Sequence, residues 1–425
     1  MKILVIGSGG REHALVWKIA QSKLVTKIFC APGNGGISQQ AERVSIEAND
    51  IPRLLEFALR EKIDLTVVGP EVALVAGITD EFNKHGLKVF GPNKAAAQLE
   101  ASKIFAKQMM IRYGIPTADF RVFSDFQEAK KYIELKNIPC VVKADGLAQG
   151  KGVVVAKTND EAIQAAEDML EKKVFGDAGN KIIIEECLQG EEASILVITD
   201  SRTIIPLASS QDHKRIFDYD QGLNTGGMGA YSPAPVVIAQ IHDAVMENIV
   251  KKIIAGLAQE KIEYKGVLYA GVMITKDGPK ALEFNVRFGD PETQAIIPRL
   301  KSDLVEIMLK VSESKLSYYQ DFSWDNRACV CIVCAAKGYP GEYKKGNQIS
   351  GLDAAASLPD VVTFHAGTKK DGKKFITNGG RVLGVTALGG TIKEAIAKAY
   401  AAVSKINFTG MQYRKDIGRK AVDSS

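Results

Sequence analysis

The sequence predicts a multi-domain α/β protein that begins with a doubly wound parallel sheet. The first 90 residues alternate short apolar runs, typical of buried strands, with amphipathic runs of helical period. A second alternation of strands with a helix follows residue 327. A chain of 425 residues also has room for two to four domains with cores of their own.

The chain opens with a buried strand at residues 2–7, followed by the glycine turn Gly7-Ser-Gly-Gly-Arg-Glu-His13 and an amphipathic helix. The free N–H groups at the start of a helix attract anions. The turn is not a dinucleotide-binding fingerprint, because Glu12 stands at its third glycine position and no ribose-binding acid follows the strand at 27–30. A nicotinamide-dependent oxidoreductase is therefore only an alternative class of enzyme.

Strands at 63–68 and 87–90 complete the predicted sheet, and each ends in a Gly-Pro pair. Ligands of such sheets bind beyond the carboxyl ends of the strands. Several residues fall on that rim and are candidates for holding a phosphorylated substrate: Gly9, Gly10, Asn34, Gly35, Gly36 and Glu71.

Residues 94–113 follow a helical pattern with Ser102-Lys103 at its middle, and residues 138–155 then predict a hairpin flap of two strands joined by a glycine loop. The loop is not a P-loop, since it lacks the Ser or Thr and enters a strand. Its amide groups and Lys143 can still close over a triphosphate. The glycines of this loop are Gly146, Gly150 and Gly152. A glycine-rich hairpin without a ligand is the alternative.

A capping box at Thr158-Asn-Asp-Glu161 predicts a helix that ends near residue 173. Residues 181–198 then predict a strand, a short connector and a second strand. A connector between two lobes exposes backbone groups to which adenine can bond, here from Glu186 to Leu188, and Glu191 is placed to reach ribose hydroxyls. A solvated, glutamate-rich edge is the alternative.

Two motifs, Gln211-Asp-His-Lys-Arg215 and Asn224-Thr-Gly-Gly-Met-Gly-Ala-Tyr231, bracket a polar segment at 216–223 that we expect to lack regular structure. Long loops inside compact domains are usually functional. A helix at about 237–260 follows, and then a strand at 266–274 that should form a hairpin with the next strand.

That next strand carries Glu283, Asn285 and Arg287 on one face, because side chains two apart in a strand point the same way. Leu282 and Phe284 are expected on the other face. Glu283 and Asn285 offer hard oxygen ligands to a cation such as Mg²⁺, and Arg287 offers a planar fork to an anion beside it. The turn Gly289-Asp-Pro-Glu292 adds two carboxylates that suit an ammonium group. A structural ion-pair strand is the alternative.

The last part of the chain begins after a helix at about 303–314 and a boundary at 321–326. Strands are expected at 328–335, 361–365 and 381–388, followed by a helix capped by Thr391. The segment Gly379-Gly-Arg381 predicts either an anion contact or a turn.

Composition excludes some classes of function. Apolar residues make up 46% and charged residues 25% of the chain, as in soluble globular proteins. A net charge of +5 without a basic block gives no support to nucleic-acid binding. No apolar run approaches the length of a membrane span, and the first residues predict a strand rather than a signal peptide, so we expect a cytoplasmic protein with no membrane contact. The six cysteines are expected to be reduced and packed.

Together these motifs resemble the glycinamide ribonucleotide synthetase family of the ATP-grasp superfamily, over essentially the whole chain. The motifs that carry the likeness are the first glycine turn, Pro32-Gly-Asn-Gly-Gly36, Leu99-Glu-Ala-Ser-Lys103, residues 143–152, both motifs around 216–223, residues 283–292 and Gly379-Gly-Arg-Val-Leu383. The resemblance implies a preATP-grasp domain at 1–101, a two-lobed α+β ATP-grasp core at 102–326 and a C-terminal mixed α/β domain at 327–425. The flap lobe of the core is expected at about 116–187 and the larger lobe at about 188–326.

The resemblance also implies the reaction, in which ATP, glycine and 5-phosphoribosylamine give glycinamide ribonucleotide, ADP and phosphate, with Mg²⁺ or Mn²⁺, in a protein expected to be a monomer. It assigns Glu283 and Asn285 to the metal and Lys103 and Lys143 to the phosphates. The residues it assigns to adenosine are Glu185, Glu186, Leu188 and Glu191. The residues that we assign to the reacting substrates are Asp212, Lys214, Asn224, Thr225, Gly226, Gly227, Arg287 and Asp290.

The expected chemistry is attack of the glycine carboxylate on ATP to form glycyl phosphate, with Lys143 and Arg287 offsetting the charge repulsion. Asp290 is the expected partner of the glycine ammonium group, and Asp212 is the alternative. Because glycyl phosphate hydrolyses in water, the loops at 146–152 and 224–229 should close over it.

Two departures from the family pattern matter. The strand at 266–274 has no metal-binding acid, which leaves the number of metal ligands open. Asp218-Tyr-Asp220 and Leu223 stand where relatives more often have Asp-Gly-Asp and Pro, and this predicts an altered loop conformation. Two further alternatives are a non-catalytic nucleotide sensor and a carboxylase or formyl-transferring purine synthetase of the same superfamily.

Overall fold

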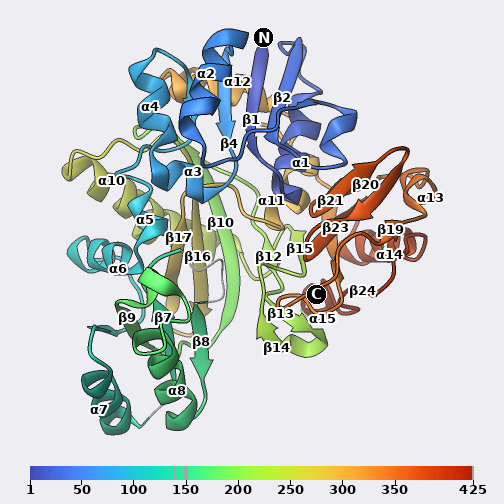
Figure 1. The fold of residues 1–425 in the computed structure, drawn as a ribbon. Helices are drawn as coiled ribbons and strands as arrows, with labels where there is room; N and C mark the ends of the chain where they lie inside the picture. The colour runs from blue at the N-terminus through green and yellow to red at the C-terminus, as the bar shows by residue number, and fades with distance from the viewer. Residues whose placement is uncertain (138, 148–151, 424–425) are drawn as a thin grey trace.

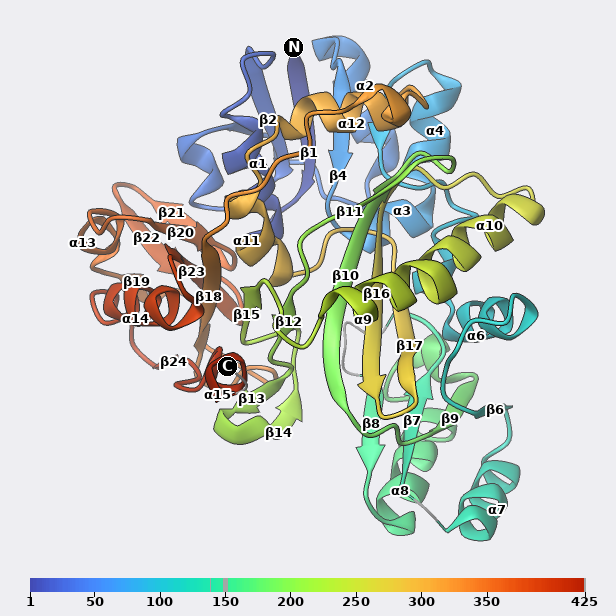
Figure 2. The same cartoon turned by 180° about the vertical axis from the view of Figure 1, so that it is seen from behind.

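The computed structural model describes residues 1–137, 139–147 and 152–423. Figure 1 shows three parts, which are an N-terminal unit in blue, a central unit of green and yellow strands with a flap below it, and a C-terminal unit in red at one side. Seen from behind, helices α9 (Ala239–Val245) and α10 (Lys251–Gln259) cross the central sheet (Figure 2). Within the described residues, no helix combines the length and apolarity needed to cross a membrane.

The N-terminal unit is the predicted doubly wound parallel sheet, with strand order β3-β2-β1-β4-β5. Alternate residues of β1 enter two different cores, so the sheet is covered on both faces. The strands are β1 (Lys2–Gly7), β2 (Lys27–Pro32), β3 (Glu42–Arg43), β4 (Leu65–Val68) and β5 (Val89–Phe90). The helices are α1 (Gly10–Ile19), α2 (Ile51–Glu61), α3 (Glu71–Ala76) and α4 (Ile78–Lys84).

The predicted helix at 94–113 is in fact two helices, α5 (Gln98–Ala101) and α6 (Lys103–Arg112). Ser102 between them is extended, with φ −127° and ψ 112°, and its hydroxyl accepts a hydrogen bond of 3.0 Å from the Phe105 amide. A serine in this position caps the following helix, so the prediction of one continuous helix was wrong.

The flap is a four-stranded sheet of order β6-β9-β7-β8. Its β7–β8 hairpin confirms the strand pair predicted around the glycine loop, and Thr158 caps α8 as predicted. The flap elements are β6 (Phe120–Phe123), α7 (Phe126–Lys136), β7 (Cys140–Ala144), β8 (Val153–Ala156), α8 (Asn159–Leu170) and β9 (Ile182–Glu186).

The central sheet is antiparallel, of order β11-β10-β16-β17, and contains the predicted hairpin. Its strands are β10 (Glu191–Thr199), β11 (Ile204–Pro206), β16 (Gly266–Thr275) and β17 (Gly278–Asn285). A β-bulge at Leu282 moves the pairing from Val272 with Ala281 to Gly271 with Glu283. Ala281 and Phe284 are therefore both buried, and the predicted simple alternation of Leu282 with Phe284 was wrong. Helices α11 (Glu292–Ile296) and α12 (Leu304–Ser312) follow.

The C-terminal unit is built on a sheet of order β12-β15-β18-β23-β20, with β24 paired to β18. All three predicted strands and the helix capped by Thr391 are present. Two strands, β12 (Gln211–Asp212) and β15 (Gly229–Ser232), come from the region assigned to the ATP-grasp core, so this sheet spans the expected boundary after residue 326. The other elements are β18 (Ala328–Ala336), β19 (Gln348–Ile349), α13 (Leu352–Ala356), β20 (Val361–His365), β21 (Thr368–Asp371), β22 (Lys374–Thr377), β23 (Arg381–Gly389), α14 (Ile392–Val403), β24 (Met411–Gln412) and α15 (Arg419–Asp423). All six cysteines are free, as predicted.

The segment at 216–223 is a small hairpin of β13 (Arg215–Phe217) and β14 (Gln221–Asn224), so the prediction of an irregular loop was wrong. The buried Arg414 side chain holds it by donating to Asp220 at 2.8 Å and to the Arg215 carbonyl at 3.2 Å. Tyr219 and Asp220 are left-handed, with φ of 58° and 55°, and Tyr219 stands at the glycine position of the family pattern described above. Sequence patterns cannot reveal this hairpin, because its partners lie about 200 residues away.

Candidate active site

Arg287, just beyond β17, is held by four hydrogen bonds within the protein. Its guanidinium donates to Glu71 at 3.2 Å, Glu100 at 2.7 Å, the Asn285 side-chain oxygen at 3.1 Å and the Phe288 carbonyl at 3.2 Å. Four of its five N–H groups are thus used by described residues. The predicted open fork for an anion is therefore largely occupied, and the guanidinium chiefly fixes the end of β17.

Glu283 lies close to several cations. Burial raises the pKa of its carboxyl, but the charges of Lys214, Lys143, Lys103 and Arg287 lower it by a larger amount. The pKa is therefore below its usual value, and the carboxyl stays ionised. The ammonium group of Lys214 lies 4.0 Å from Glu283 and 2.6 Å from Glu192.

Glu283 and Asn285 fit a cation that keeps other ligands of its own. One ionised carboxylate and one amide oxygen are hard donors, as Mg²⁺ and Mn²⁺ require. Among the described residues no group of three or more His, Cys, Asp and Glu side chains could hold a metal. Gly271, which pairs with Glu283 on β16, adds no ligand either. Two protein ligands leave the remaining positions to phosphate oxygens and water.

Two buried lysines, Lys143 of the flap and Lys107 of α6, lie around one glutamate of the flap. The Glu185 carboxylate accepts from Lys143 at 2.9 Å and lies 3.2 Å from Lys107 through the same oxygen. Its other oxygen is buried and has no hydrogen-bond partner among the described residues. An unpaired buried acceptor of this kind needs a donor, which a bound ligand or a water molecule can supply. Lys107 was not predicted, because a lysine inside a predicted helix gives no sign of a role at a site.

The other predicted nucleotide residues lie on the flap side of the site. Lys103 donates to the Gly146 carbonyl at 2.9 Å, and Glu186 pairs with Lys280 at 3.2 Å. Leu188 lies in the predicted connector between β9 and β10, and Glu191 begins β10. The carbonyl of Gly152 accepts from the Ala144 amide at 2.9 Å, whereas Gly150 lies outside the described residues.

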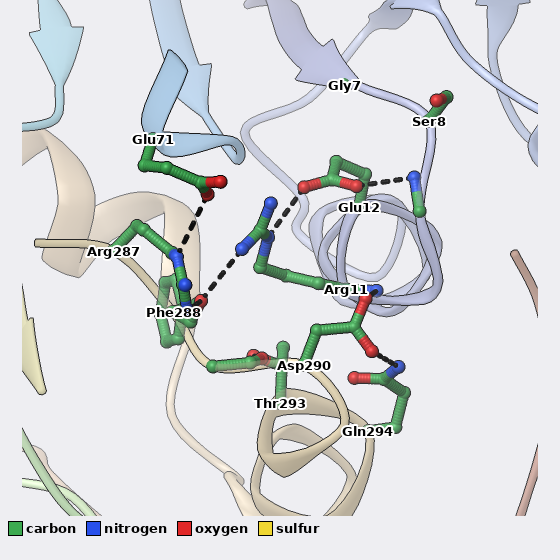
Figure 3. A network of polar contacts seen from close by, with 12 residues as sticks. Gly7, Ser8, Arg11, Glu12, Glu71, Arg287, Phe288, Asp290, Thr293 and Gln294 are labelled. Atoms are coloured by element: carbon green, nitrogen blue, oxygen red, sulfur yellow. Dashed lines mark hydrogen bonds and ion pairs between the residues drawn. The ribbon is translucent and has the colours of Figure 1, made fainter. Parts of the chain in front are cut away.

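The first glycine turn is closed by its own carboxylate. The Glu12 side chain accepts from the Gly9 amide at 2.5 Å and pairs with Arg11 at 2.6 Å (Figure 3). Gly7 and Gly69 pack so tightly on Glu12 that an added Cβ would lie 2.6 Å and 2.0 Å from it. The prediction that the Gly9 amide is free for an anion was therefore wrong. Glu12 stands three residues after Gly9, the N-cap of α1, and a glutamate at this position is a capping-box signal. The sequence therefore did indicate that Glu12 bonds the Gly9 amide.

The second glycine loop is fastened to the C-terminal unit. The Asn34 amide donates to the His365 carbonyl at 2.7 Å and to the Ser8 carbonyl at 2.9 Å. The amide of Gly35 donates to the Thr368 carbonyl at 3.1 Å, and that of Gly36 to the Asn34 side chain at 3.0 Å. These contacts place the loop on the rim but occupy amides that were predicted to face a phosphate. Gly10 begins α1 on the same rim.

Asp290 is surrounded by cations. Its carboxylate accepts from Gln294 at 2.7 Å and lies beside the Arg11 amide at 3.4 Å (Figure 3). It also lies 3.3 Å from the Arg381 guanidinium. Burial raises its pKa, but Arg381 and Arg11 lower it below the usual value.

The loop at 224–229, predicted to be a lid, is anchored at several points. Arg381 donates to the carbonyls of Gly226 at 2.6 Å and Gly227 at 3.4 Å. The Thr225 hydroxyl donates to the Lys214 carbonyl at 2.9 Å, and the Asn224 amide reaches the carbonyl of Val153 on β8 at 3.5 Å. The loop is therefore fixed to the C-terminal unit and contacts the flap at β8.

A second group of acidic residues gathers around Asp212 and Glu292, the first residue of α11. Glu292 is buried and accepts from the Tyr269 hydroxyl at 3.0 Å, with Ser194 bonded to the same tyrosine at 2.9 Å. Burial raises the pKa of nearby Asp212, Lys214 lowers it, and the charges of Glu292, Glu192 and Glu283 raise it, to about 8. Negative charge exceeds positive charge here, which suits a cationic ligand.

Known structures share this architecture. Biotin carboxylase from Campylobacter jejuni, solved as an ATP-analogue complex, superposes with a TM-score of 0.74 over 97% of this chain and 92% of its own, at 18% identity. The structure combines an α/β unit, a flap sheet that bears lysines and an antiparallel sheet with a Glu-x-Asn row. This combination defines an enzyme of the ATP-grasp class.

Family models then specify the class further. The N, ATP-grasp and C domain models of phosphoribosylglycinamide synthetase match residues 1–100, 101–293 and 329–420. Phosphoribosylamine–glycine ligases from Escherichia coli K12 and Halalkalibacterium halodurans are 54% and 52% identical, over 100% and 99% of this chain and 99% and 97% of their own lengths. The corresponding crystal structure from Thermotoga maritima gives a TM-score of 0.84 at 33% identity, covering 98% of this chain and all of its own. The chain belongs to the phosphoribosylglycinamide synthetase family.

Proposed function

We propose that the chain joins glycine to 5-phosphoribosylamine in two steps, through glycyl phosphate. The overall activity is ATP-dependent ligation in purine biosynthesis, as the family and its named members indicate. The finer assignments concern the intermediate, the metal and the residues that hold each substrate. The observation that carries them is the convergence of three lysines on Glu283, which lies two residues before Asn285 on β17.

Charge repulsion is the main obstacle to the first step. A glycine carboxylate about 4 Å from a γ-phosphate of charge near −2 costs roughly 8 kcal/mol at an effective dielectric of about 20. Lys103, Lys143 and Lys214 lie near enough to influence Glu283, and so they surround the place where the two anions meet. Mg²⁺ or Mn²⁺ held by Glu283 and Asn285 would add two further positive charges there.

The nucleotide site lies between the flap and the central sheet. We assign Lys143 and Lys103 to the phosphate oxygens, which is supported by the contacts of Lys143 with Glu185 on β9 and of Lys103 with the Gly146 carbonyl. The unpaired oxygen of Glu185 would accept a hydrogen bond from the exocyclic amino group of adenine. The backbone from Glu186 to Leu188 and the Glu191 side chain remain the candidates for the rest of adenosine.

The second step needs no strong general base, because the phosphoribosylamine nitrogen is unprotonated when it attacks the acyl carbon. The buried histidines fit this view. Burial lowers the pKa of His13 to about 3 and those of His213 and His365 to about 4, which makes all three poor bases near neutral pH. We also propose that the phosphoribosyl group lies on the rim formed by the two glycine loops and Glu71. A further part of the proposal is that the protein acts as a monomer.

Asp212, with Glu292 beside it, is the better partner for the glycine ammonium group. Asp290, the first expectation, already has Arg381 and Arg11 as counter-charges. Asp212 has a raised pKa because carboxylates crowd it, and a bound ammonium group would relieve that repulsion.

Asp212→Asn is expected to raise the glycine KM by about 10–100-fold, the worth of one charge-assisted hydrogen bond, with little change in the ATP KM. Before glycine binds, Asp212 is protonated below a pKa of about 8, and glycine favours its ionised form. The wild-type glycine KM should therefore fall as pH rises from about 6 to about 8, and the variant should lose this trend. Steady-state kinetics across this range measures both effects.

Asp277→Asn, at the exposed turn between β16 and β17, is the control and should leave the glycine KM unchanged. A larger rise in the glycine KM for Asp290→Asn than for Asp212→Asn would contradict the assignment.

A further inference from the structure

Glu100 is a buried glutamate that binds the end of β17 from the N-terminal side. One carboxylate oxygen accepts from the Val286 amide at 2.7 Å, and the other accepts from the Arg287 guanidinium at 2.7 Å. Its side chain is 8% exposed. Both oxygens are thus committed to two consecutive residues, 186 positions further along the chain.

The segment that carries Glu100 also binds the flap. Two groups donate to the Asp145 carboxylate at the flap turn, the Ser102 hydroxyl at 3.1 Å and the Ile104 amide at 3.1 Å. Lys103 donates to the next carbonyl, that of Gly146, at 2.9 Å. Residues 100–104 therefore join the flap turn to the strand that carries Glu283 and Asn285.

The contact to Arg287 extends to Asn285. The same nitrogen of Arg287 that donates to Glu100 donates to the Asn285 side-chain oxygen at 3.1 Å. An amide oxygen has two lone pairs, so this bond can orient Asn285 and still leave one lone pair for a cation. Groups that orient the ligands of a metal in this way tune its binding.

We propose that Glu100 is a positioning residue, which acts through Arg287 and the Val286 amide to fix the Asn285 side chain relative to the flap. This inference rests on the proposed role of Asn285 as a cation ligand. Burial of Glu100 against a single guanidinium shared with Glu71 supports it, because a charge is rarely buried in such a place without structural purpose.

The test compares Glu100→Gln, Glu100→Asp and the control Glu313→Gln, whose half-buried carboxylate pairs with Lys88 at 2.6 Å between the same two parts of the chain. Val286 and Arg287 donate to different oxygens of Glu100, and a glutamine has an NH₂ group in place of one of them, so Glu100→Gln sets a donor against a donor at one of the two contacts. We expect Glu100→Gln to lower kcat and to weaken Mn²⁺ binding in the presence of ADP, each by about 10–100-fold, with the ATP KM within about threefold. Electron paramagnetic resonance measures the Mn²⁺ affinity without turnover.

Two further measurements separate positioning from a general loss of structure. Glu100→Asp keeps the charge and should recover part of both losses. In an Arg287→Met background, adding Glu100→Gln should lower kcat by less than it does in the wild-type protein, because the path through Arg287 is already broken and only the Val286 contact is left to lose.

Wild-type kcat and Mn²⁺ affinity in Glu100→Gln, or a full multiplicative loss in the Arg287→Met background, would overturn the proposal. If Glu100→Gln unfolds, Glu100→Asp decides through the same two readouts. Failure of the function itself would appear differently, as an absence of glycine-dependent ADP release by the wild-type protein.

Discussion

Glu283→Gln is expected to lower kcat by about 10²–10³-fold, the loss typical of removing one preorganised electrostatic partner of a transition state. The substitution keeps the size of the side chain but removes the negative charge on which Lys214, Lys143 and Lys103 converge. Without that charge the row has only amide oxygens for a divalent cation. The metal concentration for half-maximal activity should therefore rise by at least about tenfold.

Steady-state rates measured against Mg²⁺ and Mn²⁺ concentration test this expectation. Glu263→Gln is the matched control, since that carboxylate is 57% exposed and only pairs with Lys265. A variant with normal kcat and an unchanged metal requirement would show that Glu283 serves only the fold.

Lys143→Met is expected to lower kcat/KM for ATP by about 10³-fold, because it removes the charge closest to the proposed phosphate site on the flap. Lys143 and Lys107 share one oxygen of the buried Glu185. Loss of Lys143 leaves that carboxylate with one cation, so the variant should also be less stable, by about 3 kcal/mol or less because Lys107 remains.

A kinetic comparison with Lys157→Met, an exposed lysine just after β8, separates local charge from net charge. Thermal unfolding of both variants shows how much of the loss is structural. If Lys143→Met binds ATP normally in a calorimetric titration, the assignment of Lys143 to the phosphates is wrong.

Local sequence patterns predicted those parts of the fold that depend on neighbours in the chain. The parallel sheet, the β7–β8 hairpin, the β16–β17 hairpin and the helix capped by Thr391 follow from period, turn residues and caps. Glu283 and Asn285 were found because polar residues on one face of an apolar strand are unusual.

Other features depend on contacts between distant residues, and the sequence could not supply them. Glu100 meets Arg287 across 187 positions, and Arg414 meets Asp220 across 194. The placement of β12 and β15 in the C-terminal sheet likewise depends on pairing with β18, far along the chain. Lys107, on α6, was missed because its importance comes from Glu185 on β9 of the flap sheet.

Charge balance also changed the interpretation of individual residues. Arg287 was expected to bind an anion, but carboxylates on both sides already neutralise it. Asp290 was expected to bind an ammonium group, but it has arginine partners. In both cases the residue type was informative, whereas its role depended on neighbours from other parts of the chain.

The most direct test of the two-step route follows the oxygen atoms of glycine. Glycine labelled with ¹⁸O in its carboxylate is supplied with ATP, 5-phosphoribosylamine and Mg²⁺, and the released phosphate is analysed by mass spectrometry. Attack of the carboxylate on the γ-phosphorus predicts one ¹⁸O atom in each phosphate formed. Phosphate without the label would contradict a glycyl phosphate intermediate, and with it the role proposed for the Glu283 and Asn285 row.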